Sequence, residues 1–225
     1  MEYIFLAVLA ALLLFIVSMF RPVRTGAVTG NIFAARNVFV NFYVIEADNR
    51  VLLFDTGVSK ALAKRSLQKL GFSPIDVTHI FLTHTDFDHA GGIKAFPNAE
   101  VYISCEEEQM INGTTNRKLF LKNRIPERYH LMKHGDILET AGKTVEVFLC
   151  EGHTPGSVIY LVDKRFCICG DLLRITRNGA FKPFLRLMNM EHKTNVESLK
   201  KMNEILSSSE YVMTGHTGYI RNNIS

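Results

Sequence analysis

The chain has 225 residues, 47% of them hydrophobic, and its 26 lysine and arginine residues against 22 aspartate and glutamate residues give a formal net charge of +4. About 200 residues remain after a hydrophobic N-terminal segment, which is enough for one domain with a sizeable core. No internal repeat of solenoid length is present. The small excess of positive charge gives no reason to expect a nucleic-acid partner.

The N-terminal segment from Tyr3 to Phe20 carries no charged side chain and is long enough to cross a bilayer as a helix. A cleaved signal peptide is the alternative, but the segment lacks a basic start and a small-residue cleavage site before Arg21. We therefore expect an uncut transmembrane anchor over residues 1–20 and a single-pass membrane protein. Glu2 precedes the segment while Arg21 and Arg24 follow it, so the positive-inside rule places the remaining chain on the cytoplasmic side.

The stretch Thr83–Gly92 follows an apolar run and offers four potential metal ligands: His84, Asp86, Asp88 and His89. Imidazole and carboxylate groups at this spacing converge on a cation if the backbone turns sharply, as it does where a strand ends and a helix begins. The paired glycines at 91 and 92 permit a tight turn. The alternative is that Asp86 or Asp88 only caps a helix over about residues 90–96.

Three further candidate ligands each lie in a glycine-containing loop directly after a strand-like run: His153 in Gly-His-Thr-Pro-Gly, Asp171 in Gly-Asp and His216 in Thr-Gly-His. Strands whose C-terminal ends meet at one edge of a sheet would bring these side chains into a single site. The repetition of the pattern favours a metal site over helix capping.

From about residue 41 to residue 220 the sequence resembles the metallo-β-lactamase superfamily. Five landmarks occur in the family's order: Asp55 in the strand-turn 52–57, the His84 to His89 cluster, His153, Asp171 and His216. The resemblance implies an α/β fold, a four-layer αβ/βα sandwich of two packed sheets with flanking helices and a binuclear metal centre at one end. We accordingly divide the chain into the anchor at 1–20, a linker with a first strand at 21–40, and the metallo-β-lactamase-like domain at 41–225.

The resemblance also implies two metal sites that share one bridging ligand: His84, Asp86 and His153 for the first ion, Asp88, His89 and His216 for the second, and Asp171 between them. Asp88 would orient a metal-bound hydroxide and carry the proton to the leaving group, while Asp55 would fix the cluster loop from behind the ligands. The expected cofactors are two divalent metal ions, zinc first, with iron or manganese as the alternatives.

One position departs from the family pattern. The usual cluster reads His-x-His-x-Asp-His, whereas Asp86 stands here at the second histidine position. A carboxylate in place of an imidazole adds negative charge and a harder ligand atom, which shifts the first site toward iron or manganese without excluding zinc. At this position the chain is similar to the flavodiiron branch, where a glutamate stands in the same place. Because aspartate is shorter than glutamate, Asp86 either completes the first site or leaves a single well-filled one.

Two amphipathic helices can be predicted from apolar positions at helical spacing. One begins after Ser59 and runs to about residue 70, and the other spans residues 196–206 with Thr194 or Asn195 as its cap. The four cysteines suggest no disulfide framework. Cys167 and Cys169 alternate along one strand, and we expect them to pack in the core rather than bind metal.

Two stretches outside the minimal fold are rich in lysine and arginine, residues 117–133 and residues 172–193. By resemblance the second lies near the mouth of the metal cleft, where Arg174, Lys182 and Arg186 would attract an anionic substrate. The alternative is a solvated surface or contact with anionic lipid headgroups. The apolar run within residues 180–190 would form either a lid over the site or ordinary core.

These features predict a membrane-anchored, metal-dependent hydrolase that uses a metal-bound hydroxide on a small-molecule ester, thioester, lactone, β-lactam or phosphodiester. No phosphate-binding glycine loop or serine-nucleophile elbow is present, which disfavours kinase-like and serine-hydrolase chemistry. Asp86 keeps a second class open, a di-iron oxidoreductase acting on oxygen or nitric oxide with electrons from an external donor. A non-catalytic metal-binding membrane adaptor is disfavoured by the nearly complete ligand set. The sequence leaves the oligomeric state open.

Overall fold

The computed structural model describes residues 18–117, 125 and 128–223. Within these residues the chain forms two large β-sheets and one small one. The first sheet has seven strands that lie side by side in chain order: β1 (Gly26–Thr29), β2 (Ile32–Asn37), β3 (Val40–Ala47), β4 (Arg50–Phe54), β5 (Val77–Phe81), β6 (Glu100–Ser104) and β7 (His130–Met132). Residues 21–40, expected as a linker with one strand, thus contribute both β1 and β2 to this sheet.

The second sheet has six strands in the order β15-β14-β11-β10-β9-β8: β8 (Ile137–Thr140), β9 (Lys143–Leu149), β10 (Val158–Val162), β11 (Phe166–Ile168), β14 (Tyr211–Thr214) and β15 (Gly218–Arg221). A two-stranded sheet lies beside it, formed by β12 (Leu173–Ile175) and β13 (Phe181–Pro183). Parallel pairing joins β4 to β5 in the first sheet and β11 to β14 in the second. Each of these pairs therefore sends two loops to the same sheet edge.

Alternation along β3 explains how one sheet serves two cores. Successive side chains of a strand point to opposite faces, so Tyr43 and Ile45 pack between the two large sheets. Phe42 and Val44 pack on the other face, against a helical layer. All four side chains are almost completely buried, and their burial on both faces fixes the register of the strand.

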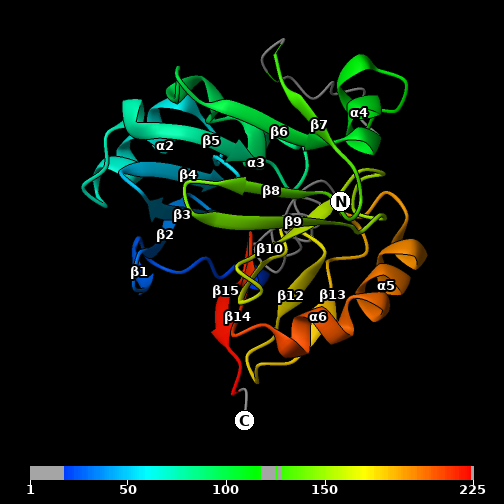
Figure 1. Ribbon diagram of the computed structural model, residues 1–225. Helices are drawn as coiled ribbons and strands as arrows, with labels where there is room; N and C mark the ends of the chain where they lie inside the picture. The colour runs from blue at the N-terminus through cyan, green and yellow to red at the C-terminus, as the bar shows by residue number, and fades with distance from the viewer. Residues whose placement is uncertain (1–17, 118–124, 126–127, 224–225) are drawn as a thin grey trace, which may run out of the picture.

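Short helices cover the outer faces of the two large sheets (Figure 1). Against the first sheet lie α2 (Lys60–Gln68), α3 (Phe87–Ala90) and the 3₁₀ turn η2 (Ile93–Ala95). Against the second lie α5 (His192–Lys201) and α6 (Asn203–Ser208). The remaining helical segments are α4 (Glu108–Asn112) and the 3₁₀ turns η1 (Pro74–Asp76) and η3 (Cys105–Glu107). The predicted α/β sandwich of two sheets with flanking helices is confirmed.

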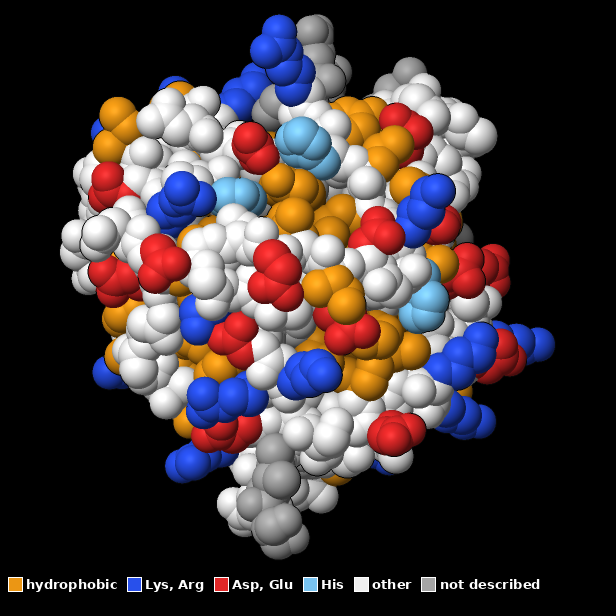
Figure 2. All heavy atoms as spheres, in the orientation of Figure 1, with side chains coloured by type: hydrophobic (Ala, Val, Ile, Leu, Met, Phe, Trp, Pro, Cys, Tyr) orange, Lys and Arg blue, Asp and Glu red, His pale blue; other side chains and the backbone are white. Residues whose placement is uncertain are grey.

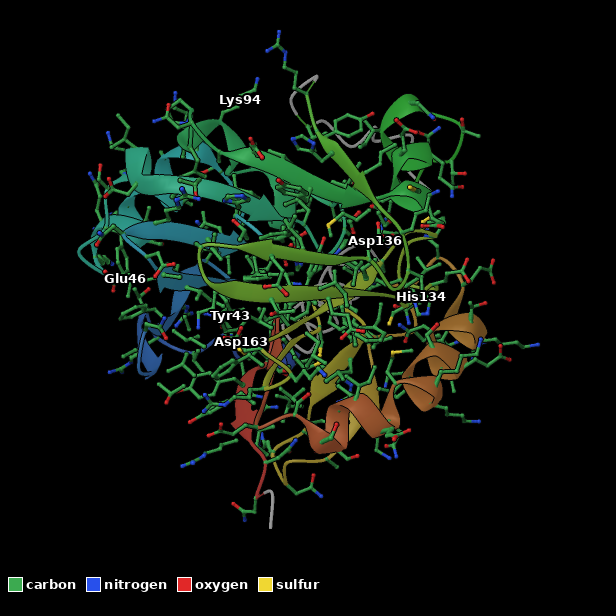
Figure 3. All side chains as sticks on the ribbon, in the orientation of Figure 1. Tyr43, Glu46, Lys94, His134, Asp136 and Asp163 are labelled. Atoms are coloured by element: carbon green, nitrogen blue, oxygen red, sulfur yellow. The ribbon has the colours of Figure 1, made fainter. Side chains whose placement is uncertain are left out.

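Tyr43 and Asp163, both labelled in Figure 3, illustrate a link between the two sheets and a turn within the second sheet. Tyr43 reaches from the first sheet into the second, where its hydroxyl lies 2.8 Å from the carbonyl oxygen of Thr214. Asp163 lies in the turn between β10 and β11, and both Asp163 and Lys164 have positive φ angles. Residues 163–165 connect the paired strand ends, and the Arg165 backbone donates to the Val162 carbonyl at 3.0 Å, which closes a tight turn. The hairpin places Cys167 and Cys169 in the buried cluster under α6, as predicted.

The prediction of a single-pass membrane protein with a cytoplasmic domain is corrected. No helix within residues 18–117, 125 and 128–223 is long and apolar enough to span a membrane. Most of the expected anchor, residues 1–17, lies outside the described residues. Phe20, at the end of the expected span, contacts folded structure instead, because its ring stacks on Phe39 at 5.9 Å between centroids.

The predicted helices exist, but their ends differ from expectation. Ser59 is the N-cap residue of α2, yet its side chain makes no capping hydrogen bond. The second helix begins after Glu191 rather than at Thr194 or Asn195. It is also divided at Met202 into α5 and α6. Asn195 is fully buried, and its side-chain amide donates to the Leu172 carbonyl. This side chain, which the sequence predicts as a helix cap, therefore makes a long-range contact instead.

The molecular face over β8 and β9 carries charged side chains of both signs, interspersed with apolar ones (Figure 2). Lys143 and Asp163, for example, form an ion pair of 2.7 Å next to the β10 turn. This face therefore carries mixed charge.

Candidate metal centre

Strand ends deliver the candidate ligands to one place. His84 follows β5 after two residues, and Asp55 follows β4 directly. On the second sheet, Asp171 lies shortly after β11 and His216 shortly after β14. A backbone hydrogen bond of 3.1 Å from Gly215 to Gly170 ties these two loops together. His153 comes from the loop between β9 and β10.

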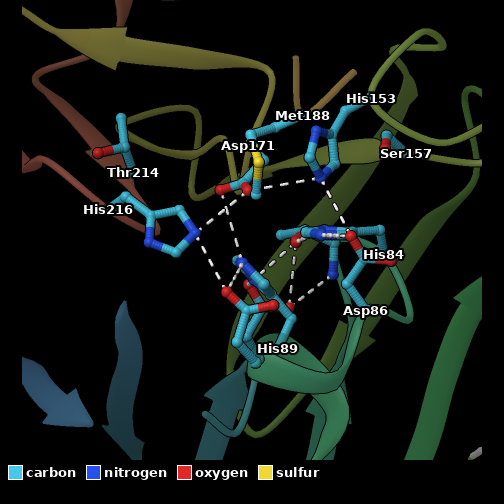
Figure 4. A network of polar contacts seen from close by, with 12 residues as sticks. His84, Asp86, His89, His153, Ser157, Asp171, Met188, Thr214 and His216 are labelled. Atoms are coloured by element: carbon cyan, nitrogen blue, oxygen red, sulfur yellow. Dashed lines mark hydrogen bonds and ion pairs between the residues drawn. The ribbon is translucent and has the colours of Figure 1, made fainter. Parts of the chain in front are cut away.

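The side chains form one network between the two sheets (Figure 4). All seven predicted ligands belong to three groups whose donor atoms lie within 4.8 Å of one another: His84 with Asp86 and His153, His84 with His89 and Asp171, and Asp88 with His89 and His216. We call the first of these the Asp86 group and the last the Asp88 group. Asp171 lies between them, since its Oδ2 is 3.2 Å from His216 Nε2 and 3.4 Å from His153 Nε2.

Every imidazole of the network is held through its Nδ1 atom. The partners of Nδ1 are the Thr83 hydroxyl for His84 (3.0 Å), the Asp55 carboxylate for His89 (2.8 Å), the Asn189 side-chain oxygen for His153 (3.1 Å) and the Phe39 carbonyl for His216 (3.0 Å). Because each of these partners accepts a hydrogen bond from Nδ1–H, we assign the tautomer that leaves the Nε2 lone pair facing the centre. This orientation is the one that metal coordination requires.

Asp55 organises the loop behind the ligands. Its carboxylate accepts hydrogen bonds from the Thr83 backbone (2.8 Å) and hydroxyl (2.9 Å) as well as from His89. Asp55 itself has a positive φ of 63°, which a non-glycine residue adopts only where the surroundings favour it. This position fits the predicted supporting role of Asp55, because the Asp55 carboxylate binds Thr83 and His89 and need not contact the metal itself.

The donor atoms fit a divalent cation. Three buried atoms of the ligand network have no hydrogen-bond partner among the described residues: His84 Nε2, His89 Nε2 and Asp171 Oδ1. They belong to one of the close groups, and unsatisfied buried acceptors are costly unless something else binds them. A Cβ atom on Gly215 would lie only 2.7 Å from His89 Cε1 and 3.0 Å from Asp171 Oδ1. Glycine thus leaves the room that a bound ion needs.

The carboxylates and histidines of the network shift one another's pKa values. Burial alone raises the pKa of Asp171, but the neighbouring histidines, His216 first, outweigh it and hold the pKa well below its usual range. Burial lowers the pKa of His89, yet the neighbouring carboxylates, Asp55 first, raise it to about 9. In the metal-free protein a proton on His89 therefore offsets part of the carboxylate charge.

The capping alternative is wrong for Asp86. This residue stands at the N-cap position of α3, but its side chain makes no capping hydrogen bond. Its carboxylate faces His84 and His153, with Oδ2 3.5 Å and 3.3 Å from the two Nε2 atoms. It also forms an ion pair with Arg117.

Sequence reasoning missed several residues that hold the centre. Glu107 is 1% exposed and accepts hydrogen bonds from the Thr85 backbone and from the hydroxyls of Thr85 and Thr154 at 2.6–2.7 Å. Asn189 orients His153. No spacing rule marks either one, because Glu107 lies in the acidic run 106–108 and Asn189 in the apolar run 180–190.

Aromatic rings line the centre next to His216. Phe20, Phe39 and Phe184 have ring centroids 4.6, 5.8 and 5.4 Å from the His216 ring. Phe184 also contacts His153 edge-on at 5.3 Å and is 2% exposed. Leu187, three residues further on, is 82% exposed. The run 180–190 therefore contributes one buried ring to the wall of the centre and exposes apolar surface beside it.

The predicted substrate-binding cations lie apart from the ligand network. Arg174 and Lys182 are cross-strand neighbours on β12 and β13, and Arg186 is exposed after β13. Arg174 lines a cavity of about 190 Å³ together with Arg21, Arg177 and Thr217. Within the described part of the chain, none of the three makes a hydrogen bond or ion pair with a candidate ligand.

Comparison with protein families shows which family the chain belongs to. The sequence profile of the metallo-beta-lactamase superfamily matches residues 35–216, a range that holds every candidate ligand and Asp55. The chain belongs to the metallo-β-lactamase superfamily.

Curated relatives of this superfamily member include hydrolases. A probable metallo-hydrolase of Mycobacterium tuberculosis is 33% identical over 152 residues, covering 58% of this chain and 48% of that protein. A hydroxyacylglutathione hydrolase of Buchnera aphidicola is 29% identical over 184 residues, covering 76% of this chain and 62% of that protein. The chain thus spans between about half and two thirds of the length of these relatives. The di-iron oxidoreductase alternative finds no support among these relatives.

Solved structures of the superfamily share the fold. A family protein from Thermus thermophilus superposes with a TM-score of 0.67 at 21% identity, covering 87% of this chain and 76% of that one. A subclass B3 metallo-β-lactamase of Bradyrhizobium japonicum gives 0.68 at 19% identity, covering 88% and 79%. A B3 enzyme described as having an active-site glutamic acid gives 0.66 at 17% identity, covering 91% and 85%.

Proposed function

We propose that this protein is a metal-dependent hydrolase whose ion is bound by the Asp88 group together with Asp171. The observation that carries the proposal is the convergence of oriented imidazole Nε2 atoms and carboxylates, three of these atoms being buried without a hydrogen-bond partner among the described residues. Nitrogen and carboxylate donors of this kind suit zinc, with iron or manganese as the alternatives. A second ion at the Asp86 group, as the sequence suggests, competes with Arg117 for the same donors.

A divalent ion bound here would supply a water ionised near neutral pH and a Lewis acid for the scissile carbonyl. The chain's own residues would position that water and move its proton. Asp88 is the residue for this step, because its side chain is 12% exposed and its Oδ2 lies 3.3 Å from His216 Nε2. Burial raises the pKa of Asp88, but His89 and then His216 lower it below its usual range. The carboxylate thus starts unprotonated, so it can accept the proton of the attacking water and then pass it to the leaving group.

The substrate class we favour is a thioester, within the wider set of esters, thioesters, lactones, β-lactams and phosphodiesters. Support comes from relatives named as hydroxyacylglutathione hydrolases, one of which aligns with 76% of this chain. The half-buried rings of Phe20 and Phe39, which lie next to His216, offer a surface for an apolar acyl part. We keep Arg174, Lys182 and Arg186 as groups that attract an anionic substrate over a distance, an effect that salt would weaken.

The test is a substrate panel with metal analysis. Zinc-loaded protein should hydrolyse hydroxyacyl thioesters of glutathione faster than a lactone, a nitrocefin-like lactam or a bis-phosphoester. Asp171→Ala should abolish turnover and lower zinc content while the melting curve stays cooperative. Glu197→Ala, which removes an exposed carboxylate on α5, is the matched control and should change nothing. Full activity in Asp171→Ala, or no bound metal in the wild-type protein, would refute the proposal.

A further inference from the structure

Arg117 lies inside the Asp86 group. Its Nε donates to Asp86 Oδ1 at 3.0 Å, and its Nη2 donates to Asp86 Oδ2. The same Nη2 donates to His153 Nε2 at 2.8 Å. Its Nη1 donates to the Met188 carbonyl. The guanidinium is thus fixed by two of the three donors that the sequence assigns to a first metal ion.

The contact with His153 is the decisive one. An arginine side chain can only donate hydrogen bonds, so its partner must offer a lone pair. The Nδ1 of His153 is engaged with Asn189, which leaves the proton on Nδ1 and a single lone pair on Nε2. That lone pair cannot bind Arg117 and a metal ion at the same time.

Asp86 is suited to the arginine in the same way. A carboxylate and a guanidinium form two parallel hydrogen bonds, and the planar pair is stronger and more directional than a single charged contact. The Asp86 side chain is 15% exposed and that of Arg117 is 22% exposed, so solvent screens the pair only in part. An imidazole at position 86 could not form this bidentate pair. Asp86, the residue that departs from the family pattern, therefore pairs with Arg117 of the same chain.

We propose that Arg117 is the resident cation of the Asp86 group, and that the centre accordingly holds one metal ion rather than two. The inference rests on the proposed metal-dependent function only for the ion at the Asp88 group. Arg117 takes the position of the first ion and presents a fixed single positive charge beside Asp86 and His153. It excludes a second divalent ion by its charge and by occupying the His153 lone pair.

The experiment is a zinc titration of metal-free protein, followed by elemental analysis of the protein after gel filtration. Wild type should retain about one ion per chain. Arg117→Ala should retain about two, because His153, Asp86 and His84 then become available together with Asp171. Arg128→Ala is the matched control, since it removes an exposed cation of the same basic stretch, and it should retain one. Cobalt spectra of both variants should follow the same stoichiometry.

Two outcomes overturn the inference. The first is a wild-type protein that retains two ions with similar affinity, and the second is an Arg117→Ala variant that stays at one ion while remaining folded in a melting experiment. If Arg117→Ala fails to fold, Arg117→Gln takes its place, because glutamine is uncharged and cannot form the bidentate ion pair. A wild-type protein that binds no ion at all would defeat the proposed metal-dependent function as well, and so is distinguishable from the other two results.

Discussion

At the scale of single residues, the four imidazoles of the centre differ in what holds them. His84 donates to a hydroxyl, His153 to an amide and His216 to a backbone carbonyl, whereas His89 donates to the carboxylate of Asp55. A carboxylate behind an imidazole fixes the ring and makes its other nitrogen a stronger ligand. His89 is also fully buried. Asp55 should therefore matter for metal affinity more than its distance from the ion suggests.

We predict that Asp55→Asn weakens zinc binding by about 10–100-fold, the usual effect of losing such a supporting carboxylate. Asparagine preserves the shape but presents an amide in place of one acceptor oxygen, so either His89 or Thr83 loses its partner. The measurement is the zinc dissociation constant by competition with a chelating dye.

Asp163→Asn is the matched control for this change, because Asp163 also has a positive φ, of 50°, but lies in the β10 turn. Its zinc affinity should equal that of wild type. Equal affinity in Asp55→Asn and wild type would contradict the assigned role of Asp55.

At the scale of elements, the centre depends on several loops that are held to one another by side-chain contacts. Glu107 at the end of η3 joins the cluster loop, through Thr85, to the loop that carries His153, through Thr154. Burial raises the pKa of Glu107, although His84 and then the hydrogen bonds to the Glu107 carboxylate oppose the shift. Gly156 packs so closely on this segment that a Cβ would lie 2.0 Å from the Glu107 nitrogen. Three separate segments are thus fixed by one buried side chain.

We predict that Glu107→Ala lowers the free energy of unfolding by about 3 kcal/mol or more, because three donors lose their acceptor in a buried site at roughly 1–3 kcal/mol each. For a chain of this size the melting temperature should fall by roughly 6–12 °C. Glu107→Gln should lose much less, since its amide oxygen still accepts from Thr85. Glu106→Ala is the neighbouring control, as its Oε2 has no hydrogen-bond partner among the described residues. A fall no larger in Glu107→Ala than in Glu106→Ala would contradict the prediction.

The difference between local patterns and long-range contacts explains which features could be predicted from the sequence. Ligand-type residues in loops after strand-like runs are a local pattern, and this pattern was sufficient to predict that the candidate ligands share one site. The sandwich followed from the family resemblance that the same residues carry. The start of α5, the break at Met202 and the role of Glu107 depend on contacts between distant segments. Arg117 is the clearest case, because its basic stretch suggests a surface for substrate, while the side chain turns inward to Asp86. Pairings of this kind leave no periodic signal in the chain.

At the scale of the whole molecule, the centre couples two sheets through a concentration of charge. The carboxylates come from both halves of the sandwich, Asp55 and Asp88 from the first and Asp171 from the second. Without an ion, their repulsion is relieved by protons on the buried histidines. Burial lowers the pKa of His216, but Asp171 and Asp88 raise it well above its usual value. The stability of the metal-free protein should therefore depend on pH.

We predict that the metal-free protein loses stability as the pH rises from about 6.5 to 9. The pKa of His89 is about 9 in the folded protein and 6.5 without the fold. A raised histidine pKa stabilises fully below the unfolded value, and this stabilisation is lost as the pH passes through the folded value. The difference corresponds to about 3 kcal/mol, or a fall in melting temperature on the order of 10 °C.

Thermal melts of chelator-treated protein at several pH values measure this effect. The zinc-loaded protein should show a smaller fall, because metal binding requires deprotonated imidazoles and strengthens as protons leave. His89→Gln is the control, since glutamine keeps a donor for Asp55 but cannot titrate, and its metal-free melting temperature should depend less on pH over the same range. A metal-free wild type whose melting temperature stays level or rises between pH 6.5 and 9 would show that His89 does not carry the proton that balances the carboxylates.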